Sequence, residues 1–177
     1  MKKRRPLPLY DPIEPDSYLI DTSAWLNIDL RADREDVWTA IISLIQQGRA
    51  FTCSQVIAEI RDDPIFPSRL KPHEEALLAC EHGLEQVTYL MHVGKVTNEH
   101  RGMSKPMASK TPADPYVIAL GELQKLVVVA DETCNNRPNR KIPGVCHQRK
   151  IKCLTLEQFV TALVCGKEKV ESATVGV

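Results

Sequence analysis

Short apolar runs alternate with longer stretches of helical spacing, and this alternation limits the possible folds more than any other feature of the chain. The runs are "SYLI" at 17–20, "AFTC" at 50–53, Val127 to Ala130 and "IKCLTL" at 151–156. Runs without polar alternation are typical of strands that helices cover on both faces, as in parallel sheets. The sequence therefore predicts an α/β protein of three layers, with helices flanking a mostly parallel sheet of about four or five strands.

Between these runs, apolar residues recur at helical spacing. Gly48 is expected to end the first helix, Ser54 to be the N-cap of the second, and Gly83 to interrupt the third. The predicted helical segments are 34–48, 55–63, 73–93, 115–126 and 156–165.

The remaining segments lack helical or strand periodicity. The polar stretches 94–113 and 133–150 are predicted to be loops. Residues 1–16 are interpreted as a leader on the surface or without order, and residues 167–177 as a frayed tail. One domain is therefore expected over 17–166.

Charge is balanced, with 23 Lys and Arg residues against 23 Asp and Glu residues. A strongly basic nucleic-acid binder is not indicated by this balance, although basic residues gather in "NRPNRK" and "HQRKIK" between 136 and 152. No run of 18 apolar residues occurs, so no membrane span is predicted and the expected compartment is the cytoplasm.

Six cysteines occur without a C-x-x-C pair. Reduced and mostly buried thiols are the expectation for a domain of this length. A zinc site built from Cys134, Cys146, His147 and Cys153 is the alternative, with irregular ligand spacing against it.

Acidic residues stand where the predicted parallel strands end and where the following helices begin. Asp21 follows the first strand, Asp131 and Glu132 follow the third, Asp114 precedes Pro115, and Glu59 lies in the helix after the second strand. These ends share one edge of an α/β sheet, where ligands usually bind. Converging carboxylates repel one another unless a cation lies between them, and hard cations such as Mg²⁺ or Mn²⁺ prefer oxygen ligands.

Each acid also has an ordinary structural interpretation. Asp114 is placed as an N-cap would be, and Glu59 as a solvated helix residue. Asp131 and Glu132 are equally suited to start a turn. Asp21 is the hardest to explain this way, because it directly follows a buried strand.

The pieces "YLIDTSAW", "SQVIAEI", "ADPYVIALG" and "VVVADE", followed by "KIPGVCHQRKIKCLTLEQF", together resemble the PIN-domain superfamily. The similarity is to a PIN-like family of bacterial proteins related to toxin ribonucleases, and it covers roughly residues 17–165. It implies a three-layer PIN-like fold and an endoribonuclease that depends on Mg²⁺ or Mn²⁺. It also implies an RNA substrate, a cognate antitoxin protein as partner and, as a further option, a homodimer.

The resemblance also implies roles for individual residues. Asp21, Glu59 and Asp114 match the three core acids. Glu132 matches the fourth, with Asp131 as its close alternative, because Ala130 replaces the usual Thr. The metal ligands would be Asp21, Asp114 and Glu132. Thr22 or Ser23 would hold the loop after the first strand and orient a water molecule.

The predicted phosphate contacts are basic residues that follow the fourth acid. They are Arg140, Lys141, Arg149, Lys150 and Lys152. A solvated basic face is the alternative for this group.

Two other functions compete with the nuclease. One is a degenerate PIN-like module that binds RNA or protein without cleaving. The other is a phosphotransfer enzyme with Asp21 as nucleophile. The phosphotransfer enzyme is disfavoured because Ser23 stands where a second Asp would be needed and because no Gly-rich phosphate loop occurs.

Overall fold

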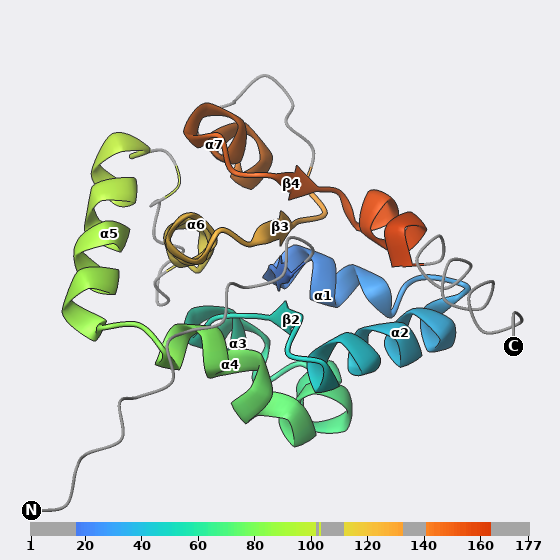
Figure 1. Ribbon diagram of the computed structural model, residues 1–177. Helices are drawn as coiled ribbons and strands as arrows, with labels where there is room; N and C mark the ends of the chain where they lie inside the picture. The colour runs from blue at the N-terminus through green and yellow to red at the C-terminus, as the bar shows by residue number, and fades with distance from the viewer. Residues whose placement is uncertain (1–16, 102, 104–111, 133–140, 164–177) are drawn as a thin grey trace, which may run out of the picture.

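A computed structural model describes residues 17–101, 103, 112–132 and 141–163. Within these residues four strands form one sheet, in the order β2-β1-β3-β4, and each neighbouring pair is parallel. β1 (Tyr18–Ile20) lies between β2 (Ala50–Phe51) and β3 (Val127–Val129), and β4 (Cys153–Leu154) pairs with β3 (Figure 1). The predicted α/β class and the parallel sheet are confirmed.

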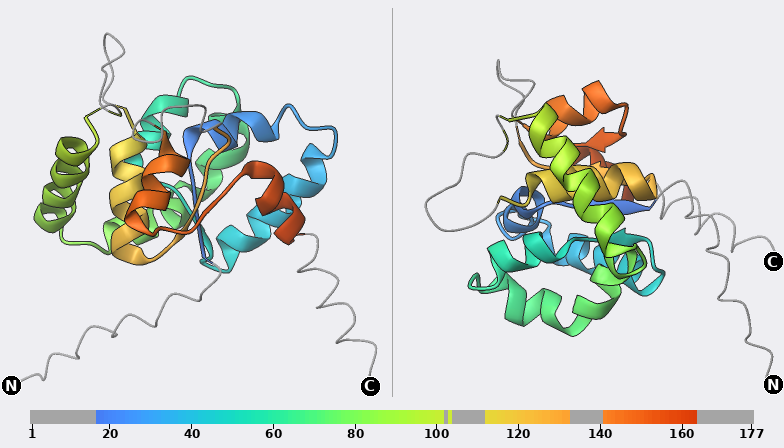
Figure 2. Two further views of the ribbon diagram at one scale, coloured as in Figure 1. Left: turned by 90° about the horizontal axis from the view of Figure 1, so that it is seen from above. Right: turned by 90° about the vertical axis from the view of Figure 1, so that its left-hand side faces the viewer.

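Helices cover the two faces of the sheet. α6 (Asp114–Gln124) and α7 (Ile142–Arg149) lie on one face, with α5 (Gln86–Glu99) outside α6 (Figure 2, left). α2 (Arg34–Gln46) and the helical residues 156–163 lie on the other face. This division follows from right-handed crossovers, because the chain moves one way across the sheet from β1 to β2 and the other way from β3 to β4.

The other helices follow the strands at one end of the sheet or pack beside β2. α1 (Thr22–Ile28) begins directly after β1, and α3 (Ser54–Ile60) begins soon after β2. A π-helical turn (Phe66–Leu70) and a 3₁₀ turn (Lys71–His73) lead into α4 (Glu74–His82), which packs against β2 and α2.

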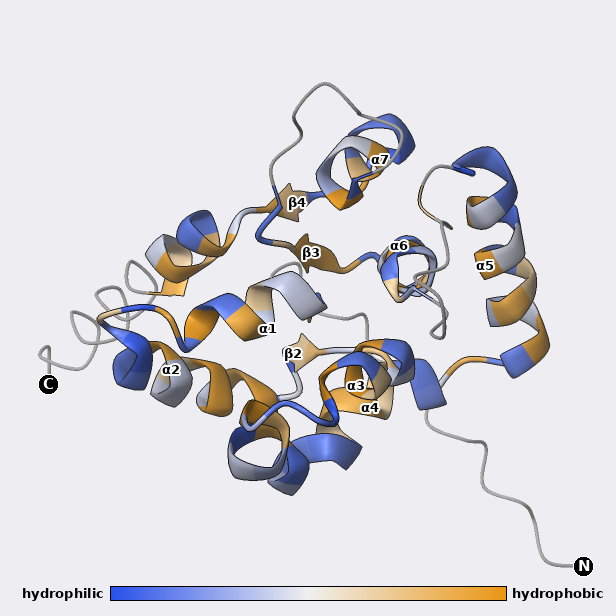
Figure 3. Cartoon of the chain, turned by 180° about the vertical axis from the view of Figure 1, so that it is seen from behind, coloured by the Kyte–Doolittle hydropathy of each residue, from blue (hydrophilic) through white to orange (hydrophobic). Residues whose placement is uncertain are grey.

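The core is formed by the strands and by the inward faces of the helices. Leu19, Val128 and Val129 are fully buried, and β3 and β4 stand out as apolar in Figure 3. Trp25 and Trp38 stack with ring centroids 5.7 Å apart, which joins α1 to α2. Gly121 lets α6 approach β3 closely, because a Cβ atom there would lie 2.8 Å from a methyl group of Val128.

Both predicted loops contain helix. α5 continues to Glu99 because Tyr89, Val93 and Val96 are buried at helical spacing. The polar residues Lys95, Asn98 and Glu99 belong to its exposed faces. α7 begins at Ile142, where Pro143 occupies the first turn of the helix. The loop predicted over 133–150 was therefore wrong over 142–149.

Two smaller predictions at helix starts are also corrected. The residues after Asp21 form α1 and not a loop. Cys53, not Ser54, occupies the N-cap position of α3. Ser54 instead donates its backbone N–H and its hydroxyl to the carboxylate of Glu81, at 2.6 and 2.9 Å. The predicted leader and the tail at 167–177 lie outside the described residues.

Candidate functional site

Asp21 lies at the carboxyl end of the central strand and is only 3% exposed. It is the N-cap of α1, and its Oδ2 atom accepts hydrogen bonds from the Ser23 backbone N–H at 3.1 Å and the Ser23 hydroxyl at 2.7 Å. Burial raises its pKa to about 6 although these hydrogen bonds oppose the shift, and the charge of Glu132 adds to the rise. Asp21 is thus a carboxylate held out of water at the edge of the sheet where ligands usually bind in α/β proteins.

Asp114 is the first residue of α6 and is half-buried. Ala113 takes the N-cap position, so the expected capping role of Asp114 is corrected, and among the described residues no donor bonds its carboxylate. Burial raises the pKa of Asp114 to about 7, helped by the charges of Asp21, Glu132 and Glu59. The charge of Asp21 is therefore one of the causes that raise the pKa of Asp114.

Glu59 reaches the same region from α3. Its Oε2 atom accepts a hydrogen bond from the Thr22 hydroxyl, and its Oε1 atom accepts one from the backbone N–H of Ala113 at 2.9 Å. The side chain thereby connects α3 to the first turns of α1 and α6. Glu59 is not a solvated helix residue, because both of its oxygens are bonded to other elements.

The two acids after β3 face different neighbours. Asp131 is exposed, and its Oδ2 atom accepts a hydrogen bond from the amide of Asn27 on α1 at 2.8 Å. Glu132 has a side chain that is 18% exposed, and it contacts the Lys141 ammonium at 2.6 Å. The charge of Glu132, but not that of Asp131, is among the causes that raise the pKa of Asp21 and of Asp114. The geometry therefore favours Glu132 as the fourth member of the group.

We define the carboxylate group as Asp21, Glu59, Asp114 and Glu132. Within the described parts of the chain, no three His, Cys, Asp or Glu side chains are gathered closely enough to hold a metal ion together. The donors nevertheless suit a hard divalent cation, because all are carboxylate oxygens. The buried Asp21 and the half-buried Asp114 also have raised pKa values. Asp21 and Asp114 would hold such an ion, with Glu132 as the third ligand.

Ser23 and Thr22 each bond a member of the carboxylate group. Ser23 bonds Asp21, and its hydroxyl oxygen also accepts the backbone N–H of Asp131 at 3.0 Å. Thr22 bonds Glu59. Asn27 was not among the predicted site residues. Its contact with Asp131 depends on α1, which begins immediately after Asp21 where a loop was predicted.

The structure brings one of the predicted basic residues to the carboxylates. Lys141 precedes α7 and contacts Glu132. Arg149 lies at the other end of α7, and Lys150 and Lys152 are exposed on the way into β4. Arg149, Lys150 and Lys152 are therefore near the amino end of β4. Asp21 and Glu132 instead follow the carboxyl ends of β1 and β3. Arg140 lies outside the described residues.

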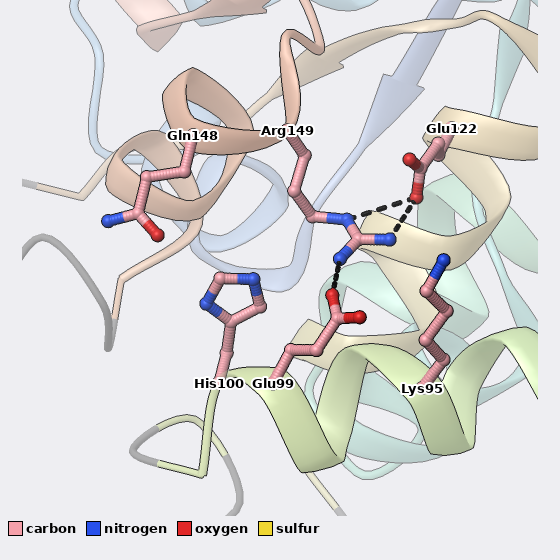
Figure 4. Close-up of a pocket in the computed structure, with 6 residues that line it drawn as sticks. All are labelled: Lys95, Glu99, His100, Glu122, Gln148 and Arg149. Carbon is pink, nitrogen blue, oxygen red and sulfur yellow. Dashed lines mark hydrogen bonds and ion pairs between the residues drawn. The ribbon is translucent and has the colours of Figure 1, made fainter.

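Arg149 belongs to a separate ionic cluster between α5, α6 and α7 (Figure 4). Its guanidinium donates to Glu122 at 2.5 and 3.0 Å and also to Glu99, and His92 contacts Glu122 at 2.7 Å. The cluster borders a cavity of about 370 Å³, which is also lined by Lys95, His100 and Gln148. Because the Arg149 side chain is only 8% exposed and bonded to two carboxylates, it holds helices together and is not free for phosphate.

The alternative zinc site stays a prediction, because the structure describes only part of it. Cys53, Cys80, Cys146 and Cys153 are free thiols, and Cys134 lies outside the described residues. Cys146 and Cys153 lie side by side, and the hydrogen bond between them raises the pKa of Cys146 and lowers that of Cys153.

Taken together, the fold and the site define an α/β protein with buried and half-buried carboxylates at the carboxyl edge of a parallel sheet. Residues 18–165 match the model of the family described as a domain of unknown function (DUF4411), and the chain belongs to that family. The comparison with curated proteins finds no match. None of the helices in the described residues has the length and apolar character needed to cross a membrane.

Proposed function

We propose that this protein is a metal-dependent endoribonuclease of the PIN type. The observation that carries the proposal is the pairing of two desolvated carboxylates, Asp21 and Asp114, from elements that are far apart in sequence. Keeping two such charges close together is unfavourable without a cation, and perturbed carboxylates of this kind gather at functional sites.

The carboxylates would bind Mg²⁺ or Mn²⁺, which activates water and stabilises the charge that develops on a phosphodiester. Asp21 and Asp114 would supply two ligands, and Glu132 the third. Ser23 fixes Asp21 through two hydrogen bonds, so the buried carboxylate has one orientation. Glu59 positions the first turn of α6, and with it Asp114, through Ala113.

The biological role follows from the PIN-like resemblance. We infer a cytoplasmic toxin of a toxin–antitoxin pair, with RNA as substrate and a cognate antitoxin protein as partner. A homodimer is compatible with that role. Purification alone and with the neighbouring gene product, followed by light scattering, tests the assembly separately from catalysis.

Cleavage of a fluorescent single-stranded RNA with Mn²⁺, Mg²⁺ or EDTA tests the activity. We expect cleavage with either metal, none with EDTA, and at least a 100-fold loss for Asp114→Asn. Asp36→Asn is the matched control, because Asp36 is an exposed acid in the first turn of α2. Cleavage that persists in Asp114→Asn or in EDTA would refute the proposed chemistry.

A degenerate module that binds RNA or protein without cleaving is the second candidate. It is favoured by the absence of three gathered metal ligands among the described residues and by the partners that Glu59 and Glu132 already have. RNA binding that is equal with Mn²⁺ and with EDTA, without cleavage in either, would select this function.

A further inference from the structure

Lys141 and Ile142, at the start of α7, both contact Glu132 of the carboxylate group. Its ammonium contacts Glu132 Oε1 at 2.6 Å, and the other oxygen of Glu132 accepts the backbone N–H of Ile142 at 3.4 Å. Lys141 is the N-cap residue of α7, so its backbone is fixed where the helix begins. The contact is therefore a defined feature of the fold and not a chance meeting of two surface chains.

The charge of Lys141 acts on more than its direct partner. The ammonium is stabilised first by the hydrogen bond to Glu132, and the charges of Asp114 and Asp21 contribute further. In the opposite direction, Lys141 partly offsets the repulsion that the other acids exert on Asp114. A cation on the chain itself thus neutralises part of the carboxylate group.

We propose that Lys141 is a tethered counter-ion that competes with the divalent metal for Glu132. In the metal-free protein the ammonium draws Glu132 toward α7. When a metal ion binds, Glu132 turns to it and the ammonium leaves. The Lys141 side chain is 46% exposed, so it has room to move aside.

This inference rests on the proposed metal-dependent function and adds a regulatory element to it. It also explains why three carboxylates are not gathered among the described residues, because Glu132 is engaged elsewhere. The released ammonium would remain at the edge of the site, where a phosphate is the anion it would meet. The competing view, that Lys141 only contacts phosphate, does not involve the metal equilibrium.

Mn²⁺ titration of the protein without RNA tests the inference. Calorimetry, or electron paramagnetic resonance of free Mn²⁺, gives the affinity at low ionic strength. Lys141→Gln should bind Mn²⁺ at least about tenfold more tightly than the original protein, because a unit charge close to the metal is removed. Lys141→Arg keeps the charge and should remain close to the original affinity.

Lys125→Gln is the matched control, because Lys125 is exposed at the end of α6 opposite Asp114. Its affinity should stay within about twofold of the original protein, since the charge removed is distant and screened. Lys141→Met provides a second neutral variant that keeps no hydrogen-bonding group, and it should also bind more tightly.

The outcomes separate this inference from the proposed function. If Mn²⁺ binds equally or more weakly in both neutral Lys141 variants, the counter-ion role is refuted and the metal site stands. If Mn²⁺ binds to none of the proteins, the metal site and the counter-ion role are refuted together.

Discussion

Glu59 and Ala113 are joined by a hydrogen bond of 2.9 Å, in which the backbone N–H of Ala113 donates to the Glu59 carboxylate. Ala113 is fully buried, and it immediately precedes Asp114. The other oxygen of Glu59 is bonded to Thr22, which follows Asp21. One side chain on α3 therefore fixes the residues beside Asp21 and Asp114.

This relationship predicts different results for two substitutions of Glu59. Glu59→Ala leaves the buried N–H of Ala113 without an acceptor, so the free energy of unfolding should fall by about 1–3 kcal/mol. Glu59→Gln retains an oxygen for Ala113 and an amide for Thr22, and should change stability by less than about 1 kcal/mol. Urea denaturation measures both. Equal losses would mean that the charge of Glu59, not its bonding, is what stabilises the fold.

Asp114→Asn should change how stability depends on pH. The pKa of Asp114 is about 7 in the folded protein against 3.8 for the ordinary side chain, so the folded state holds its proton more tightly. Its contribution to stability is present below about pH 4 and is lost as the pH rises toward 7. The Asn variant should match the original protein at pH 4 and exceed it by about 1–3 kcal/mol at pH 8.

The measurement is urea denaturation in EDTA across this pH range. Adding Mn²⁺ at pH 8 should stabilise the original protein and remove much of the difference. An Asn variant that is less stable at pH 8 would show that the Asp114 carboxylate has a structural role in the metal-free fold.

Alanine substitution of two helical glycines, Gly121 and Gly94, should change the free energy of unfolding in opposite directions. Gly121→Ala places a methyl group 2.8 Å from a methyl group of Val128, which is buried and stiff. Overpacking should lower stability by about 1–3 kcal/mol. The better helix propensity of Ala offsets up to about 1 kcal/mol of this loss. Gly94→Ala lies in open space on α5 and should stabilise by about 0.5–1 kcal/mol. Thermal denaturation measures both variants, and a Gly121→Ala protein as stable as Gly94→Ala would contradict the predicted overpacking.

Removal of the Arg149 charge should weaken the fold. Arg149→Gln leaves Glu99 and Glu122 without their common partner, and we expect a loss of about 1–3 kcal/mol. Lys150→Gln is the control, because Lys150 is exposed at the end of the same helix and should change stability by less than about 0.5 kcal/mol. A neutral result for Arg149→Gln would mean that its ion pairs contribute no net stability.

RNA binding should separate the exposed basic residues from Arg149. If Lys150 and Lys152 contact phosphate, their double Gln variant should flatten the salt dependence of binding by about one unit per lost contact. Arg149→Gln should leave that slope unchanged, because its guanidinium is already bonded to carboxylates. Fluorescence anisotropy with a short RNA at several salt concentrations gives the slopes. An unchanged slope in the double variant would show that Lys150 and Lys152 belong to a solvated face.

The parallel sheet was predictable because its strands are uninterrupted apolar runs, and the end of β1 placed Asp21 correctly. α7 was not predictable in the same way. Its Pro143 and Gly144 are typical of turns when considered locally, and only the burial of Ile142, Val145 and Cys146 against the sheet selects the helix. Tertiary packing overrode local propensity there.

The carboxylate group was predictable in membership but not in arrangement. The sequence left Asp131 and Glu132 as alternatives, because adjacent residues after a strand point in different directions. Their partners differ, and these are Asn27 for Asp131 and Lys141 for Glu132. Neither contact has a signature in the sequence, since each depends on where a helix begins on another part of the chain.

The central position of β1 has a consequence for the order in which the protein acquires its shape during synthesis. β1 obtains its first neighbour when residues 50–51 have been made, but its second neighbour begins only at Val127. The backbone N–H of Asp21 donates to the carbonyl of Val129, so the hydrogen bond of Asp21 also requires β3. Until residue 129 has left the ribosome, one edge of β1 is unpaired and the backbone N–H of Asp21 lacks its acceptor. Any activity that depends on this acid is therefore delayed until most of the domain has left the ribosome.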